Sequence, residues 1–529
     1  MTKGAPSTHI LNAISLIIIG VSWFIMGKYM FMKDLSPNGD NYYYLHLMQS
    51  MWEGNGYGTT MTGEFKPSNW FPPGYPTILL VERWLFGNNI ILFKWANLSF
   101  FLGTIVLVWH WMKEAMSNGH AAFVVACLLL MNGGLWHLGA QIMSEMSFMF
   151  FTFFALWSYT KIQRLEAFWR SPWFYTTIFS LGISCLIRSI GVAAGAAIFM
   201  HLLLQKQWRP ALVVLIGFLM LTSPWSMRNK ALGLQGRYAE TIFKKNNWNP
   251  DEGKVTTWED WRGKITTNVY DTIFRGTLDV MVPGQYPKTQ ENWIWITGGV
   301  LLLLILFGLF ILGPSGHVML IFLVFTGAAL LLWHGGNQSR YVWPMAPVLY
   351  VGGVTSVLTL SSRLLRRLNV NPVPGFVFIL LFMGFLMRPK LDIYQSNAIN
   401  PFNKGYKSYL SLADTIKDIP INDPMVVCRK PMIFHHHSNA RTVSFPFTAD
   451  SVRMLEHLVS NKPDFIILDN MGYNSAHKYL TPFLNKHREM YSIVTQMNPK
   501  MYLLRWRQEP AEKKLKEWRQ ALQTASTDH

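Results

Sequence analysis

Asp40 and Glu145 are isolated acidic residues, each just outside an apolar stretch of the sequence. A carboxylate at the edge of a bilayer is costly to bury unless it has a cationic partner, a metal or a catalytic task. An acid there could accept the proton of an attacking hydroxyl. Two such acids, without histidine, would suit a partly hydrated divalent cation, Mg²⁺ or Mn²⁺. The structural alternatives are a helix N-cap for Asp40 and a solvated carboxylate for Glu145.

Basic residues lie at the same side of the apolar stretches. Arg188, Arg228 and Arg340 each fall at an end of a stretch, with Tyr341 directly after Arg340, and Lys66 precedes a Pro-Pro-Gly-Tyr-Pro turn. A guanidinium group can bind two phosphate oxygens at once. The alternative for any one of these arginines is that its charged end simply extends to water from the membrane interface. The pattern therefore predicts a phosphate-binding region, provided that the arginines converge.

The composition predicts that membrane helices position these residues. Half of the 529 residues are hydrophobic and only 14% are charged, whereas soluble domains carry about 25% charged residues. A helix crosses the hydrocarbon layer with about 20 residues. We expect about eleven such helices, at residues 10–30, 90–112, 120–138, 143–161, 173–188, 189–205, 210–224, 293–313, 317–334, 341–360 and 373–388.

The short loops predict the orientation of the chain. Basic residues gather on one side, at Lys113, Lys161 and Lys206 among others, and that side is expected to be cytoplasmic. The N-terminus would then be cytoplasmic, and an odd number of helices would place the C-terminal part outside. We predict a transmembrane domain over residues 1–388 with external loops at 31–89 and 225–292, followed by a periplasmic domain over 389–529.

The composition changes after residue 388 and predicts a small α/β domain. Strands are expected at 425–428, 441–445 and 464–468, with two more between 491 and 506, because these runs are short, apolar and rich in β-branched residues. Helical spacing of apolar residues predicts helices at 450–460 and 474–487, and a charged helix at 510–524.

The charge and the cysteines exclude two classes of function. The formal net charge is +18, from 47 basic and 29 acidic residues, but the excess is spread over membrane loops and the tail rather than gathered on a soluble basic domain. Attraction to anionic membrane lipids or phosphorylated lipid substrates explains it, and no nucleic-acid partner is expected. Three cysteines, of which two lie in apolar stretches, do not form a disulfide framework, and redox chemistry is not expected.

Six local motifs, taken in order, carry a family resemblance. They are Asp40 with Tyr44-Leu45, the Gly56-Tyr57-Gly58 turn, Pro72-Pro73-Gly74-Tyr75-Pro76, Ser144-Glu145, Pro224-Trp225 with Arg228-Asn229, and Arg340-Tyr341 with Pro344 and Pro347. This series resembles the GT-C superfamily of membrane glycosyltransferases, and especially the protein O-mannosyltransferases and the aminoarabinose transferases that use polyprenyl-phosphate sugars. The resemblance covers residues 10 to about 390.

The resemblance implies an inverting glycosyltransferase of the bacterial inner membrane. It implies that a sugar passes from a polyprenyl-phosphate donor to a hydroxyl of a lipid, glycan or protein acceptor at the outer face of the membrane. Asp40 matches the general base and Glu145 the second catalytic acid, and the same two positions could hold a divalent metal. Arg340 with Tyr341 matches the donor-phosphate position, and Arg188, Arg228 and Lys66 would assist.

Two other functional classes fit parts of the same pattern. A lipid or polysaccharide transporter, such as a flippase, would also need acids and arginines near lipid, but such sites usually lie at the bilayer midplane. A scaffold that carries an external domain is the other alternative. Only the enzyme requires Asp40 for sugar transfer.

Overall fold

The computed structural model describes residues 8–162, 168–234, 237–246, 250–284, 286–287, 289–333, 339–367, 373–498 and 500–527. The chain forms two compact units. The helical unit comprises Met1–Lys33, Asn69–Phe243 and Val255–Ile399, and the α/β unit comprises Asp34–Ser68, Lys244–Lys254 and Asn400–His529.

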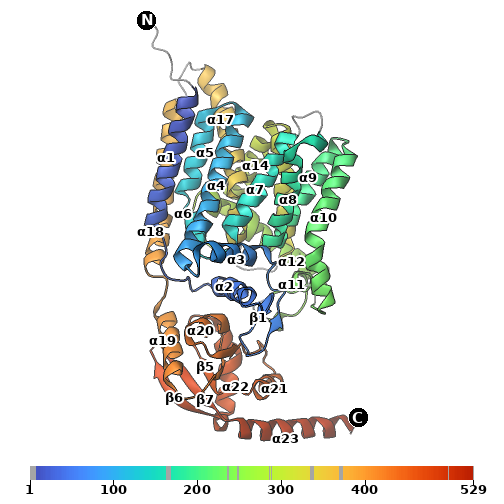
Figure 1. Cartoon of the computed structure of the whole chain (residues 1–529), viewed down its shortest axis with the longest axis vertical. Coiled ribbons are helices and arrows are strands. Elements are labelled where there is room, and N and C mark those ends of the chain that lie inside the picture. Colours follow the sequence, from blue (N-terminus) through green and yellow to red (C-terminus); the bar gives the residue numbers. More distant parts are fainter. Residues whose placement is uncertain are drawn as a thin grey trace. The chain divides into compact units, whose positions relative to one another are not determined.

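Long apolar helices build the helical unit. In chain order the helices are α1 (Thr8–Tyr29), α3 (Gly74–Phe86), α4 (Ile90–Met116), α5 (Gly119–Met131), α6 (Gly133–Gly139), α7 (Glu145–Ile162), η1 (Phe168–Arg170), α8 (Pro172–Ile187), η2 (Ser189–Gly191), α9 (Val192–Leu204), α10 (Trp208–Ala231), α11 (Arg237–Ile242), α12 (Trp258–Asn268), η4 (Val269–Phe274), α13 (Arg275–Met281), α14 (Asn292–Ile311), α15 (Pro314–Leu331), α16 (Ser339–Val342), η5 (Trp343–Met345), α17 (Ala346–Arg367) and α18 (Val373–Ile399). The longer ones run side by side, and α3 lies across them near one end (Figure 1).

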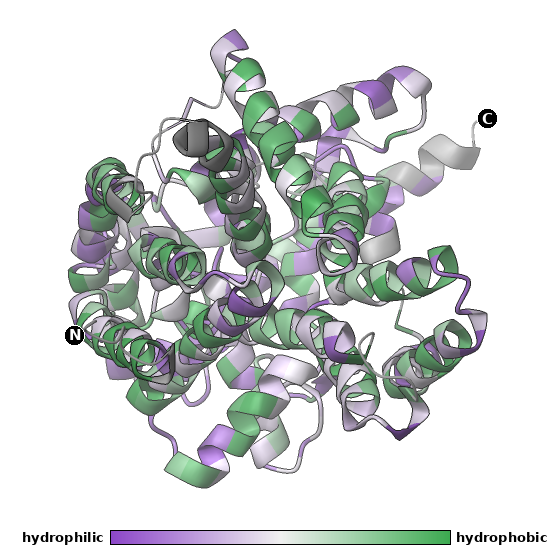
Figure 2. Cartoon of the chain, turned by 90° about the horizontal axis from the view of Figure 1, so that it is seen from above, coloured by the Kyte–Doolittle hydropathy of each residue, from purple (hydrophilic) through white to green (hydrophobic). Residues whose placement is uncertain are grey.

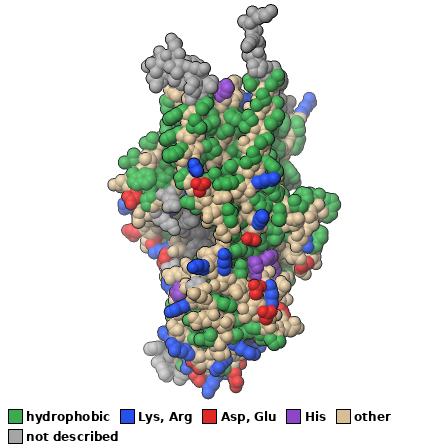
Figure 3. Space-filling model, turned by 90° about the vertical axis from the view of Figure 1, so that its left-hand side faces the viewer, with side chains coloured by type: hydrophobic (Ala, Val, Ile, Leu, Met, Phe, Trp, Pro, Cys, Tyr) green, Lys and Arg blue, Asp and Glu red, His purple; other side chains and the backbone are tan. Residues whose placement is uncertain are grey.

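The outer surface of this unit is apolar, as a bilayer requires. The most apolar 18-residue window of α14 has a mean hydropathy of 2.7, yet only 28% of it is buried inside the protein. Large side chains such as Leu381 and Phe385 of α18 are exposed, and hydrophobic residues lie on outward helix faces (Figure 2) and cover the helices seen in Figure 3. An exposed apolar surface of this size is unfavourable in water and favourable in lipid, so the chain is a multi-pass membrane protein.

Within the described residues, six helices meet the length and composition of a membrane span, and a seventh does so if one bent pair is counted. The predicted number of about eleven therefore stays a prediction, although α7, α8, α9 and α18 occupy four of the remaining predicted stretches. Helix α12 begins at Trp258 and carries a capping box between Thr257 and Asp260.

The stretch predicted as a span at 120–138 forms two helices rather than one. The chain bends by 61° between α5 and α6, at Asn132. The Asn132 side-chain oxygen accepts hydrogen bonds from the backbone of Gly134 and Leu135, and its amide donates to Val280 O at 2.8 Å and Tyr350 Oη at 3.1 Å. Backbone groups released by a bend in a membrane must find protein partners, and Asn132 caps the second helix from within the bundle.

The α/β unit has a five-stranded mixed sheet. Its elements are α2 (Gly39–Trp52), β1 (Gly58–Thr59), β2 (Lys66–Pro67), η3 (Pro250–Glu252), α19 (Lys404–Asp418), β3 (Met425–Val427), α20 (Pro431–Ser438), β4 (Arg441–Val443), α21 (Ser451–Asn461), β5 (Phe465–Leu468), η6 (Ala476–Leu480), α22 (Thr481–Lys486), η7 (Arg488–Met490), β6 (Tyr491–Met497), β7 (Met501–Trp506) and α23 (Gln508–Thr527). The strand order is β4-β3-β5-β7-β6. The first three strands are parallel, and β7 and β6 are antiparallel to their neighbours.

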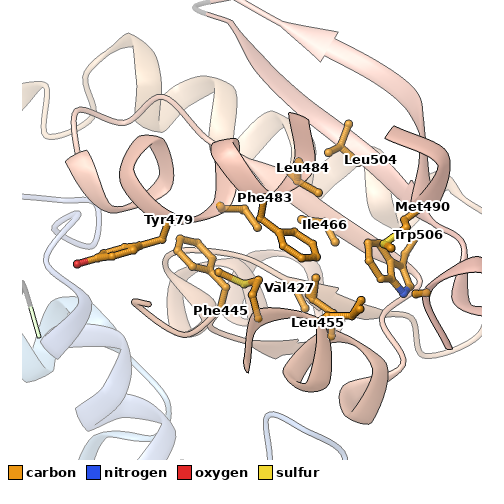
Figure 4. Packing of buried hydrophobic residues seen from close by; sticks show 14 of the residues in the cluster. Val427, Phe445, Leu455, Ile466, Tyr479, Phe483, Leu484, Met490, Leu504 and Trp506 are labelled. Carbon is orange, nitrogen blue, oxygen red and sulfur yellow. The ribbon is translucent and has the colours of Figure 1, made fainter. Parts of the chain in front are cut away.

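All five strands lie where the sequence predicts them. Their inward side chains, together with helices α21 and α22, form one apolar core around Leu455, Ile466, Phe483 and Leu504 (Figure 4). The unit also takes in segments that the sequence analysis assigned to loops of the transmembrane domain. Within this unit, Tyr406 Oη donates to Pro37 O at 3.2 Å. Helix α18 of the helical unit continues to Ile399, and the C-terminal segment of the α/β unit begins at Asn400.

Candidate active site

Glu145 is the centre of a charged cluster in the helical unit. Its side chain is fully buried, and its Oε1 atom lies 2.9 Å from Arg188 Nη1 and 2.8 Å from Arg340 Nε. The side chains of Arg188 and Arg340 remain 16% and 28% exposed. The cluster therefore has a closed acidic end and a basic end that still reaches the surface.

Neighbouring groups hold the two arginines in place. Arg188 Nη1 also donates to Ser144 Oγ at 3.1 Å, and the Arg188 guanidinium lies 6.0 Å from the centre of the Tyr341 ring. Arg340 Nη2 lies 3.9 Å from Met143 Sδ. Residues from three separate parts of the sequence thus meet at one carboxylate.

The start of helix α7 positions the carboxylate. Glu145 is the first residue of α7, and the unpaired backbone N–H groups at a helix N-terminus favour a negative charge. The positive charges of the two guanidinium groups also stabilise the ionised carboxylate. An acid that is costly in a membrane protein is accommodated here by opposite charges and by the helix end.

Two glycines fix the position of Arg188, which ends helix α8 in an extended conformation. A Cβ atom on Gly74, at the start of α3, would lie 2.6 Å from the carbonyl carbon of Leu186. A Cβ atom on Gly191 would lie 2.7 Å from Cys185 N. Only glycine permits such close contact between backbones, so the Pro-Pro-Gly-Tyr-Pro motif seats α3 directly against the turn that carries Arg188.

Arg340 and Tyr341 lie on the single turn α16, directly before η5 and α17. Pro344 occupies the first turn of η5, where its missing N–H would have no partner in any case. The short α16 turn presents Arg340 to Glu145, and its neighbour Tyr341 to Arg188. Arg340 and Tyr341 therefore contribute together to the cluster, because Arg340 contacts Glu145 and Tyr341 contacts Arg188.

The cluster as a whole favours an anion. Within the helical unit the guanidinium groups of Arg188 and Arg340 both contact the carboxylate of Glu145, and the partly exposed side chains of this cluster are the cationic ones. Glu145 Oε2 is buried and has no hydrogen-bond partner among the described residues. Two cations already at Oε1 would repel a divalent metal ion there, so these surroundings do not fit a metal at Glu145.

Asp40 and Lys66 belong to the α/β unit. Asp40 lies in the first turn of α2, but the N-cap of that helix is Asn38, whose side chain accepts a hydrogen bond from the Asp40 backbone N–H. The N-cap alternative for Asp40 is therefore wrong, and its carboxylate is not needed for that purpose. Lys66 is exposed on β2, paired with Thr59 across a small hairpin.

Arg228 occupies the last turn of α10. Its guanidinium stacks on Trp225 at 5.0 Å and donates to Asn229 Oδ1 at 2.8 Å. Both of these contacts are with neighbours on its own helix, whereas Arg188 and Arg340 contact Glu145.

A histidine that sequence reasoning did not single out holds α2 in place. His46 Nε2 accepts a hydrogen bond from the Thr60 backbone N–H at 3.1 Å, and its ring centre lies 5.2 Å from that of His435. Burial, and then the nearby His435 and His436, lower the pKa of His46 to about 4. His46 is therefore neutral at physiological pH. In the part of the chain that the structure describes, no group of three His, Cys, Asp or Glu side chains is arranged to hold a metal.

Sequence reasoning also missed Lys94, which is completely buried in α4. Its Nζ donates to Met32 O at 2.7 Å, and so ties the chain that follows α1 to the bundle. The signal was present, because a single lysine inside an apolar stretch always needs a partner. The partner is a backbone carbonyl, which no sequence pattern identifies.

Comparisons with known proteins concern the family and the fold. Residues 67–237 match the family model of dolichyl-phosphate-mannose-protein mannosyltransferases. The fold is similar to that of ArnT from Cupriavidus metallidurans bound to undecaprenyl phosphate, with a TM-score of 0.55, 13% identity and coverage of 94% of this chain and 98% of that chain. The apo state of ArnT gives a TM-score of 0.56 at the same identity and coverage. None of the curated proteins compared matches the chain.

These matches confirm the predicted resemblance and the fold class: a GT-C arrangement of membrane helices with a small C-terminal sheet. The match to the mannosyltransferase family model covers residues 67–237, and the likeness to ArnT shows the fold.

Proposed function

We propose that this membrane protein transfers a sugar from a polyprenyl-phosphate donor to an acceptor hydroxyl, with inversion at the anomeric carbon. The observation that carries the proposal is the pair of guanidinium groups of Arg188 and Arg340, both fixed by the buried Glu145. The likeness to an ArnT structure that holds undecaprenyl phosphate supports the same donor class.

Arg188 and Arg340 are proposed to bind the donor phosphate. Both keep part of their side chain exposed, and a guanidinium binds phosphate through parallel charge-assisted hydrogen bonds. Their charge would stabilise the phosphate as the anomeric C–O bond breaks and negative charge gathers on it. Tyr341 would orient Arg188 through its ring, and Arg228 and Lys66 are proposed as additional cations for the donor.

Glu145 is proposed to act on the donor through the arginines. Because it is fully buried and contacts both guanidinium groups, it would fix the spacing at which they meet the phosphate. This role differs from the direct catalysis and the metal binding that the family resemblance implies for Glu145.

Asp40 is the proposed general base. The acceptor oxygen would form a bond to the anomeric carbon and lose its proton to the Asp40 carboxylate, while polyprenyl phosphate leaves with the electrons of the broken C–O bond. Asp40 could also help to hold Mg²⁺ or Mn²⁺, which favours oxygen ligands. No step above depends on that ion.

The acceptor would be a hydroxyl of a lipid, glycan or protein at the outer face of a bacterial inner membrane. The positive residues of the short loops support an N-terminus in the cytoplasm and an α/β unit in the periplasm. Membrane lipids surround the helical unit in this arrangement.

The substitution Asp40→Asn tests the proposed function. The envelope lipids and glycans of three strains would be compared by mass spectrometry: a deletion strain, and the same strain carrying the wild-type or the Asn protein. We expect the Asn strain to match the deletion strain, with one sugar decoration missing and a prenyl-linked sugar accumulated, although the protein reaches its normal level in the membrane.

Asp34→Asn is a matched control, because it removes an exposed acid from the same segment, Asp34–Ser68. Its strain should keep the decoration. Normal decoration in the Asp40→Asn strain would refute Asp40 as the base. Loss of lipid translocation without accumulation of a prenyl-linked sugar would instead support a flippase.

A further inference from the structure

Two cations lie at the carboxyl ends of the parallel strands of the α/β unit. Arg429 and Lys430 follow β3 by two and three residues, and the neighbouring strand β5 ends directly before Asp469. The carboxyl ends of adjacent parallel strands are the place where open α/β sheets usually bind ligands. Because β3 and β5 are paired at Val427 and Ile466, these three residues emerge at the same edge.

Arg429 and Lys430 both lie close to the ring of Tyr473. The Arg429 guanidinium lies 5.0 Å from the centre of the Tyr473 ring, and Lys430 Nζ lies 4.6 Å from the same centre. Arg429 also lies 4.7 Å from the Phe447 ring. Two positive charges held at one ring repel each other, and among the described residues neither forms an ion pair with a carboxylate.

Most donor capacity of these cations is unused. Arg429 donates its Nε–H to Ser475 Oγ, but the terminal nitrogens of its guanidinium have no acceptor within the described part of the chain. The same holds for Lys430 Nζ. Both side chains are only half-buried, so their free N–H groups can meet a ligand.

Asp469 supplies a complementary, unsatisfied acceptor. It is 1% exposed. Its Oδ1 accepts from the Met471 backbone N–H at 3.3 Å, whereas Oδ2 has no hydrogen-bond partner among the described residues. Burial raises the pKa of Asp469, and the Met471 N–H and the charge of Arg429 offset only part of that effect. A buried acceptor without a donor is costly, which points to a hydroxyl donor from outside the chain.

We propose that Arg429, Lys430 and Asp469 form a binding site for an anionic saccharide, a sugar that carries a phosphate or carboxylate. The anionic group would accept hydrogen bonds from Arg429 and Lys430, and a ring hydroxyl would donate to Asp469 Oδ2, which it reaches as Arg429 shifts toward the bound anion. Resting on the proposed function, this site would select a charged glycan or the charged sugar headgroup of a lipid as the acceptor.

Binding to the full-length protein in detergent tests the site without any transfer reaction. Isothermal titration would compare glucose 6-phosphate, inorganic phosphate and glucose. We expect glucose 6-phosphate to bind most tightly, and its Kd to rise at least tenfold in Arg429→Gln and in Lys430→Gln. Arg429→Lys, which keeps the charge, should recover part of the affinity. Arg453→Gln, an exposed arginine of α21, is the matched control and should bind as the wild type does.

Asp469→Asn distinguishes a saccharide from a simple anion. The amide oxygen can still accept from the Met471 N–H, but the second oxygen is lost. Binding of glucose 6-phosphate should weaken, and binding of inorganic phosphate should stay equal or tighten because a negative charge is removed. Equal weakening of both ligands, equal affinity for glucose and its phosphate, or a Kd unchanged by Arg429→Gln and Lys430→Gln would each overturn the proposal.

The binding result is separate from the proposed function. If Asp40→Asn keeps sugar transfer while glucose 6-phosphate binds as expected, the proposed base fails and the saccharide site stands. If transfer is lost in Asp40→Asn but no saccharide phosphate binds, the enzyme stands and the site fails.

Discussion

Replacing Glu145 by Gln should show whether the charge of this carboxylate holds Arg188 and Arg340 in place. The substitution keeps the shape of the side chain and removes its charge. Each guanidinium lies within 2.9 Å of Oε1, so each attraction amounts to about 6 kcal/mol at an effective dielectric constant near 20. Desolvation of the buried carboxylate offsets most of this gain.

The net effect can be bounded from buried ion pairs in general. Removing one partner of a buried pair costs about 3–5 kcal/mol, because the remaining charge is left uncompensated. Arg188 and Arg340 are 16% and 28% exposed, which lets water screen them and favours the lower end, about 3 kcal/mol. We expect a lower unfolding temperature, and a loss of sugar transfer of at least tenfold because the two cations repel each other.

Glu114→Gln is the matched control in the same bundle. Glu114 pairs with Lys161, and both side chains are partly exposed, so its loss should cost about 1 kcal/mol or less. The double variant Glu145→Gln/Arg188→Gln should be more stable than the sum of its two single variants predicts, since it removes one of the uncompensated cations. Unfolding of Glu145→Gln at the wild-type temperature, with additive double-variant energies, would refute the reasoning.

Three further predictions follow from individual contacts. Gly74→Ala should destabilise the protein by about 1–3 kcal/mol, because the new Cβ meets backbone atoms, whereas Gly263→Ala, with open space around it, should be neutral or slightly stabilising; thermal unfolding measures both. Arg188→Lys should raise the KM for the donor about tenfold, or about 1.4 kcal/mol, with a smaller effect on kcat, because lysine cannot contact phosphate and Ser144 with one planar group; an unchanged KM would exclude Arg188 from donor binding. Since the pKa of His46 is lowered to about 4 from 6.5, the unfolded chain binds more protons between these values, so stability should fall as pH drops from 6.5 toward 4; His46→Gln should flatten this dependence, and an equal slope in both proteins would contradict it.

The sequence by itself determined the class of the protein and much of its secondary structure. The apolar stretches near 20 residues predicted membrane helices because hydrocarbon thickness imposes that length. The five strands of the tail were predictable because short β-branched runs such as Met425–Val427 and Phe465–Leu468 are bounded by turn residues. The order of the local motifs also predicted the GT-C resemblance, which the comparisons confirm.

The sequence pattern did not predict the bend at Asn132. Hydropathy measures only the average preference of a stretch for lipid, and residues 120–138 are mostly apolar. The bend depends on partners more than a hundred positions away, Val280 O and Tyr350 Oη, that receive the Asn132 amide. Lys94 is a similar case, since its partner is the carbonyl of Met32.

The tertiary structure alone decided the surroundings of the charged residues. The sequence placed Glu145, Arg188 and Arg340 at the ends of separate helices, but whether they would meet depends on how those helices pack. Close backbone contact at Gly74 and Gly191 brings the turn with Arg188 to Glu145, and α16 brings Arg340 from almost two hundred residues away. Helix periodicity is a local property, whereas an ion pair of this kind forms only when distant segments share one buried space.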